Sequence, residues 1–239
     1  MFGRRGVLVS QSSRYEPVPD QGGCHPTATL LPSHVLVSFV RFGYDVVQGV
    51  SHFLLMLLDF NIDKAIAAAG YLIERQGGVE DMFMLVKKLY YSDRSALIRW
   101  GKSITGDELA SLQKGPIVSG IYDLLKGKGS ISRQIKWNDI IERQEPYKIL
   151  LRKQPDVSIL AEREKDVLEE SRQTIGAIRG SVPKWLHKHC PEWNDPGQSS
   201  SPIDPANILR LAKKSEEEIL RIEKANEEIR LLNYLLAAR

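Results

Sequence analysis

The chain has 239 residues and a net charge of +3, and its apolar and charged fractions, 42% and 26%, are those of an ordinary soluble protein. Its basic residues are scattered along the sequence, which argues against a nucleic-acid-binding protein. The only two cysteines, Cys24 and Cys190, are far apart, as is typical of proteins from a reducing compartment and not of a disulfide scaffold. We therefore expect a cytoplasmic protein.

Residues 1–55 differ in composition from the rest of the chain, because they contain several prolines and no sustained helical or strand period. Two interpretations remain open: a disordered extension, or upstream sequence translated from a misassigned start codon, with Met56 as the first residue. We favour the second, because strong helical patterning begins just after Met56. The apolar stretch 35–58 is interrupted by charged residues, so we expect no membrane insertion.

Helical patterns dominate the first half of the remaining chain, 56–239. Residues 61–77 place apolar side chains on one face and end at Gly77, and a second helical run covers 79–100. After a turn at Gly106 and Asp107, Pro116 suits the first position of a third helix, which ends near Gly127.

The second half adds a short β element and a long helix. Residues 131–153 carry β-forming side chains on both sides of a proline turn, which predicts a small hairpin. Helices then return, first over about 158–178 and then as a short helix capped by Ser181. Asp204 and Pro205 start a long C-terminal amphipathic helix, about 205–237. The predicted fold class is mainly α: a compact helical domain with a small β-hairpin insertion.

The order of several short motifs resembles the Panacea domain, the SocA-like antitoxin family. A first block contains KLYYSD, with Tyr90, Tyr91 and Asp93, and then Trp100-Gly101 where the family has Tyr-Gly. It continues with the ITGD turn ending at Asp107, then KGPIVS and IYDLLKG, which contain Gly115, Pro116 and Tyr122. A second block runs from Trp185-Leu186-His187 to Cys190-Pro191-Glu192-Trp193 and is followed by Pro202-Ile203. The resemblance extends from about Asp59 to the middle of the last helix.

This resemblance implies a helical antitoxin of a type II toxin–antitoxin pair, which binds and neutralises a protein toxin encoded by the adjacent gene. The family has no recognised catalytic residues, so we expect neither an enzyme nor a cofactor. Two alternatives remain: a proteolytic adaptor that delivers a toxin or another protein to a protease, and a transcriptional or nucleic-acid-binding regulator. The second is less favoured, because no helix rich in Arg and Lys is visible.

The candidate toxin-binding residues combine the motif positions with the last helix. Aromatic side chains supply much of the energy of protein interfaces, although a core position is the favoured interpretation for Tyr90 and Trp100. We expect Gly115 and Pro116 to set a backbone turn. The apolar stripe of the last helix either packs on its own domain, which is the default, or enters a groove on the toxin or on a second copy of this chain. The candidates are Tyr90, Tyr91, Asp93, Trp100, Gly115, Pro116, Tyr122 and Leu232.

His187, His189 and Cys190 have the residue types of a zinc site but not its geometry, because residues two apart on a helix point in different directions. We therefore expect no metal. The predicted role of His187, Pro191 and Trp193 is structural: His187 hydrogen-bonds locally and Trp193 packs under a loop.

Overall fold

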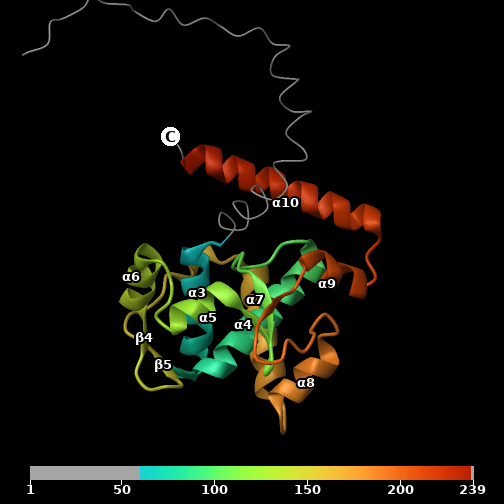
Figure 1. Cartoon of the computed structure of the whole chain (residues 1–239). Coiled ribbons are helices and arrows are strands. Elements are labelled where there is room, and N and C mark those ends of the chain that lie inside the picture. Colours follow the sequence, from blue (N-terminus) through green and yellow to red (C-terminus); the bar gives the residue numbers. More distant parts are fainter. Residues whose placement is uncertain (1–59, 238–239) are drawn as a thin grey trace, which may run out of the picture. The chain divides into compact units, whose positions relative to one another are not determined.

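The computed structural model describes residues 60–237, with the side chains of Tyr234 and Ala237 excepted, and is mainly helical, as predicted (Figure 1). The leader predicted over residues 1–55 lies outside the described residues. The eight α-helices of the described part are α3 (Ile62–Arg75), α4 (Met82–Trp100), α5 (Ser119–Leu125), α6 (Ile131–Ile140), α7 (Glu162–Gly176), α8 (Val182–His189), α9 (Pro205–Leu211) and α10 (Glu216–Ala237).

Two three-stranded antiparallel sheets complete the described fold. One has the strand order β1-β5-β4, formed by Val79–Asp81, Lys148–Leu151 and Ile141–Arg143. The other has the order β3-β2-β6, formed by Gly115–Val118, Leu109–Leu112 and Ser201–Pro202. A short 3₁₀ helix, Val157–Ile159, precedes α7. Among the helices of residues 60–237 we find no candidate membrane span.

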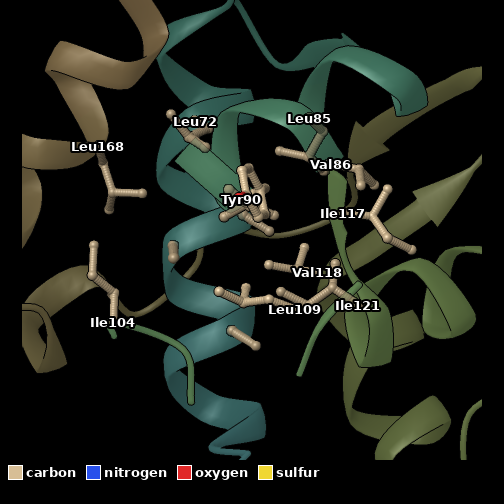
Figure 2. Close-up of a cluster of buried hydrophobic side chains, with 14 of the residues drawn as sticks. Leu72, Leu85, Val86, Tyr90, Ile104, Leu109, Ile117, Val118, Ile121 and Leu168 are labelled. Atoms are coloured by element: carbon tan, nitrogen blue, oxygen red, sulfur yellow. The ribbon is translucent and has the colours of Figure 1, made fainter. Parts of the chain in front are cut away.

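The core is built around α4, whose apolar face is buried by helices and strands from both halves of the chain. Tyr90 is completely buried, and Figure 2 shows labelled side chains from several elements gathered around it, among them Leu72, Leu168 and Ile117. Burial of each such large apolar side chain contributes roughly 1.5–3 kcal/mol. Helix α4 is therefore the element against which the others are positioned.

Three of the predicted helix starts are confirmed, and one of them is that of α9, where the Asp204 carboxylate accepts from the Ala206 N–H at 2.9 Å. The side-chain oxygen of Asn61 accepts hydrogen bonds from the N–H groups of Asp63 and Lys64, at 3.1 and 3.0 Å. Ser181 caps α8 through the N–H of Lys184. The helix predicted from Val79 instead begins at Met82, because Val79–Asp81 pairs with β5 and the Asp81 carboxylate caps the first turn.

The hairpin predicted over 131–153 is shorter than expected, because residues 131–140 form helix α6. Only β4 and β5 form the hairpin, and β1 adds a third strand to it. The β-branched Ile131 and Ile135, which suggested a strand, are exposed on α6, whereas Trp137 is buried. Burial of this one indole on a helical face outweighs the local strand preference, as tertiary context commonly does.

The helix predicted to start at Pro116 is also wrong, since Gly115–Val118 is strand β3 and the next helix, α5, starts at Ser119. Gly115 has a φ of 95°, which a glycine adopts at little cost and which directs the chain into a tight turn after β2. The pairing of β2 with β3 follows, with Leu112 opposite Gly115. The β3-β2-β6 sheet was therefore not predicted.

The long helix predicted over 205–237 is divided into α9 and α10. Lys213 has a φ of 63°, a left-handed conformation that ends the first helix. Ser215 then starts α10 with a capping box: the Glu218 carboxylate accepts from the Ser215 N–H at 2.9 Å, and the Ser215 hydroxyl accepts from the Glu218 N–H at 3.2 Å. Two reciprocal bonds at this point favour a new helix over a continuous one.

Helix α10 contacts the end of α4 at a glycine. Gly101 terminates α4 with a φ of 77°, and its N–H donates to the Leu97 carbonyl at 2.8 Å. Its own carbonyl accepts from the side-chain amide of Asn226 at 2.7 Å. A Cβ at this glycine would lie 2.9 Å from Ile222. The first turns of α10 therefore rest directly on backbone, with Ile219 buried beside them.

We predict that Gly101→Ala destabilises the domain and loosens α10. The left-handed conformation costs an alanine roughly 1–2 kcal/mol, and the added methyl group collides with Ile222. Urea unfolding measures the first effect, and amide hydrogen exchange over residues 216–237 measures the second. The matched control is Gly77→Ala, where φ is 89° but an added Cβ meets nothing within 4 Å. Equal protection of α10 in both variants would contradict the contact.

Candidate interaction surface

Tyr90, the first aromatic of the motif, belongs to a buried polar network and not to the surface. Its hydroxyl donates to Glu192, and the guanidinium of Arg94 binds the same carboxylate through two nitrogens. Burial raises the pKa of Tyr90 well above its usual value, so the hydroxyl stays a donor. The network joins α4 to the segment after α8. Sequence reasoning quoted Glu192 within the second motif but did not assign it this role.

Asp93 ties the segment after α4 back onto the helix. One carboxylate oxygen accepts from the N–H groups of Ile104 and Thr105, at 2.9 and 3.1 Å, and the other accepts from the Thr105 hydroxyl. The side chain is fully buried, and burial raises its pKa to about 6 although these hydrogen bonds oppose the shift. Asp93 is therefore not accessible to a protein partner. Its hydrogen bonds fix the backbone of the ITGD turn.

Asp107, at the other end of this turn, caps α5. Its two oxygens accept from the N–H groups of Gly120 and Ile121, at 2.7 and 2.8 Å. Burial raises the pKa of Asp107 to about 7, and the nearby charge of Asp93 adds to the shift. A Cβ at Gly120 would lie 2.8 Å from the carboxylate, so a glycine is required for this approach.

Gly115 and Pro116 are buried on the side of β3 that faces α4. The ammonium of Lys87 donates to both of their carbonyl oxygens, each at 2.8 Å. Burial lowers the pKa of Lys87 to about 7. The glycine and the proline thus hold a buried lysine through their backbone, and neither is available to a partner.

His187 and His189 point in different directions, as their spacing predicts, and each stacks on a different tryptophan. The His187 ring stacks on Trp193 at 3.5 Å between centroids, and the His189 ring stacks on Trp185 at 4.0 Å. Burial raises the pKa of Cys190 to about 12, so its thiol stays protonated. Within residues 60–237 no group of three His, Cys, Asp or Glu side chains is placed to hold a metal ion.

The expected local hydrogen bond of His187 is wrong, because its buried Nε2 has no partner among the described residues. Stacking replaces it. The indole N–H of Trp193 donates to the Leu112 carbonyl at 2.9 Å and fastens the loop to β2. Pro191 is exposed in this loop.

Three of the candidate aromatic residues are half-buried and partly covered by neighbours. Tyr91 meets the edge of Trp185 at 5.8 Å, the guanidinium of Arg163 lies 4.9 Å from the Trp100 ring, and Lys126 lies over Tyr122. Such cation–π contacts contribute about 0.5–1 kcal/mol at exposed sites. These rings are therefore only partly accessible to a protein partner.

Half of the exposed large apolar side chains of the described residues lie on α10. Ala225, Ile229, Leu232 and Leu236 follow one another at spacings of four, three and four, which places them on one side of the helix. We call this the α10 stripe. Leu232 is 54% exposed and Leu236 57%. The default expectation that the last helix packs on its own domain therefore holds for the turns around Ile219 and Ile222, whereas the described structure leaves the later turns uncovered.

Residues 85–194 match the family model described as the antitoxin SocA-like, Panacea domain. The resemblance to the Panacea domain is therefore confirmed over these residues. The match runs from the middle of α4 to the residue after Trp193, which is narrower at both ends than the resemblance predicted. It contains the Tyr90, Asp93, Asp107 and Lys87 networks, whereas α10 lies outside it. No curated protein and no solved structure matches the chain.

The two buried carboxylates of the Panacea domain are predicted to respond differently to Asn. In Asp93→Asn, Oδ1 still accepts both backbone N–H groups and the new amide donates to the Thr105 hydroxyl, so the cost is about 1 kcal/mol or less. In Asp107→Asn, the amide faces a backbone N–H and leaves it unsatisfied, which costs about 1–3 kcal/mol more. Urea unfolding at neutral pH measures the free energy of unfolding of both variants. Equal losses of stability would contradict the assigned hydrogen bonds.

The raised pKa of Asp93 predicts that stability depends on pH. A carboxyl whose pKa is raised on folding stabilises the native state below its unfolded pKa, near 4, and loses that contribution as pH rises through its folded pKa. For Asp93 this window runs from about 4 to about 6. The wild-type free energy of unfolding should therefore fall across this window by roughly 3 kcal/mol more than that of Asp93→Asn. Parallel curves for the two chains would show that Asp93 titrates normally.

Proposed function

We propose that the chain is the antitoxin of a type II toxin–antitoxin pair and that it neutralises a cognate protein toxin, encoded by the adjacent gene, through direct binding. The observation that carries this proposal is the match of residues 85–194 to the antitoxin SocA-like, Panacea domain. The exposed α10 stripe supports it, because an apolar helix face of this kind is suited to bury against a partner.

The buried titratable side chains support binding over catalysis. Asp93 and Asp107 hold backbone N–H groups, Glu192 holds Tyr90 and Arg94, and Lys87 holds two carbonyls. Each of these groups already has structural partners, and a catalytic acid or base must be within reach of a substrate proton. The domain therefore presents a preformed surface, and neutralisation follows from covering the toxin's active or substrate-binding surface.

Growth rescue tests the proposed function. The adjacent gene is expressed alone and together with this full chain, and colony formation is compared. We expect the adjacent gene to prevent growth and this chain to restore it, with both proteins recovered as one complex and the toxin at unchanged abundance. A harmless neighbour would contradict the toxin partner. Rescue that depends on a protease and lowers toxin abundance would favour the adaptor alternative.

We further predict that Leu232→Asp abolishes rescue without unfolding the domain. Leu232 is exposed at the centre of the uncovered part of the α10 stripe, so the carboxylate costs the free protein little but is buried unpaired in a complex. Loss of a central apolar anchor costs about 2 kcal/mol or more, or at least ~30-fold in affinity. Titration calorimetry with the toxin measures this loss of affinity.

Leu220→Asp is the matched control. Leu220 is 66% exposed on the same helix but lies outside the stripe, so this variant should rescue normally. Full rescue by Leu232→Asp would exclude the stripe as the toxin-binding face. If the wild-type chain sediments as a dimer and Leu232→Asp as a monomer, the stripe instead joins two copies of this chain.

A further inference from the structure

A groove lies between α10, the end of α4 and the start of α7. Its volume is about 360 Å³. Trp100, Ile222 and Ile229 supply apolar walls, and Lys102, Arg163 and Arg221 supply three cations. Ligand pockets typically have volumes of about 300–1,000 Å³, so this groove is large enough for one or two side chains and not for a folded element.

The lining of the groove is positively charged, since it contains three cations and no Asp or Glu. Arg221 has a carboxylate 3.7 Å away, that of Glu217 on the preceding turn of α10. In the part of the chain that the structure describes, Lys102 and Arg163 make no ion pair, although surface cations elsewhere on the domain, such as Lys136 and Arg99, have acidic partners. A bound segment that carries carboxylates would supply acidic partners for Lys102 and Arg163.

The geometry of the aromatic wall favours a peptide over a nucleic acid. Single-stranded nucleic acids stack their bases on open aromatic faces. The guanidinium of Arg163 already lies 4.9 Å from the Trp100 ring. The other walls are the aliphatic side chains of α10, Ile222 and Ile229, which suit an apolar side chain.

The groove is also continuous with the α10 stripe, because Ala225 and Ile229 belong to both. A partner that covers Leu232 therefore reaches the groove along the same helix face. We infer that the groove receives an acidic peptide segment of the partner, which inserts an apolar anchor residue against Trp100 and Ile229 and pairs its carboxylates with Lys102 and Arg163. That the partner is a toxin rests on the proposed function; the chemistry of the segment does not.

The test uses two fluorescein-labelled hexapeptides, acetyl-Asp-Glu-Leu-Phe-Asp-Glu-amide and its counterpart with Lys at the four acidic positions. Fluorescence anisotropy is measured with the full chain at low and high salt. We expect the acidic peptide to bind, the basic one not to bind, and high salt to weaken the binding. In the double variant Lys102→Glu, Arg163→Glu, affinity should fall by roughly tenfold or more. Ile229→Asp should also weaken binding, because it removes an apolar wall.

The control double variant is Lys188→Glu, Arg179→Glu, which makes the same change in net charge at exposed residues that do not line the groove. It should bind the acidic peptide as the wild type does, and circular dichroism checks the fold of every variant. Equal affinity for the two peptides, or an equal loss in both double variants, would overturn the inference. Tighter binding of an oligothymidylate than of the acidic peptide would replace it with a nucleic-acid groove.

The peptide assay tests the groove and growth rescue tests the toxin partner, so their outcomes are independent. Rescue without any preference for the acidic peptide would leave the proposed function standing and refute the groove. A clear preference without rescue would establish the groove and refute the toxin partner.

Discussion

The buried carboxylate of Asp93 is the constraint on which the surrounding structure depends. It holds Ile104 and Thr105, in the middle of the short segment that follows the helix, against α4. At one end, Gly101 receives Ile222 and Asn226 of α10. At the other end, Asp107 is placed to cap α5. The Asp93 carboxylate therefore holds the segment that connects the α10 contact at Gly101 with the Asp107 cap of α5.

Several charged groups are buried in this domain, which is costly, because removal of an ion from water is unfavourable by several kcal/mol even after relaxation. Hydrogen bonds compensate this cost, and two sets of them join segments far apart in the sequence: Lys87 joins α4 to β3, and Glu192 joins the loop after α8 to Tyr90. Apolar contacts are non-directional, so they tolerate several arrangements of these strands and loops. Hydrogen bonds to a buried charge tolerate only one, and we attribute the precise position of β3 and of the Trp193 loop to them.

Periodicity and capping chemistry were sufficient where the information is local. The apolar face of α3 and the Ser181 cap of α8 were both read from neighbouring residues. The errors fell where a distant contact decides the structure. Trp137 makes α6 a helix by inserting its indole into the core, and the β2 strand, not the proline, determines that Pro116 is extended. The break at Lys213 is different, since the Ser215–Glu218 capping box was present in the sequence and was missed.

The candidate surface shows the same limit more sharply. The sequence favoured a core position for both Tyr90 and Trp100, but in the structure only Tyr90 is fully buried, whereas Trp100 and Tyr91 are half-buried. For helix α10, an apolar stripe was predicted from residue spacing alone, whereas the groove beside it was not predicted. Four of the nine residues that line the groove lie within residues 85–194, and the other five lie on a helix outside the matched region. The walls at Trp100 and Arg163 are thus part of the Panacea domain, whereas Ile222 and Ile229 are supplied by the segment that follows it. Changes confined to α10 would therefore alter the shape and charge of the groove without removing any hydrogen bond of Asp93 or Glu192.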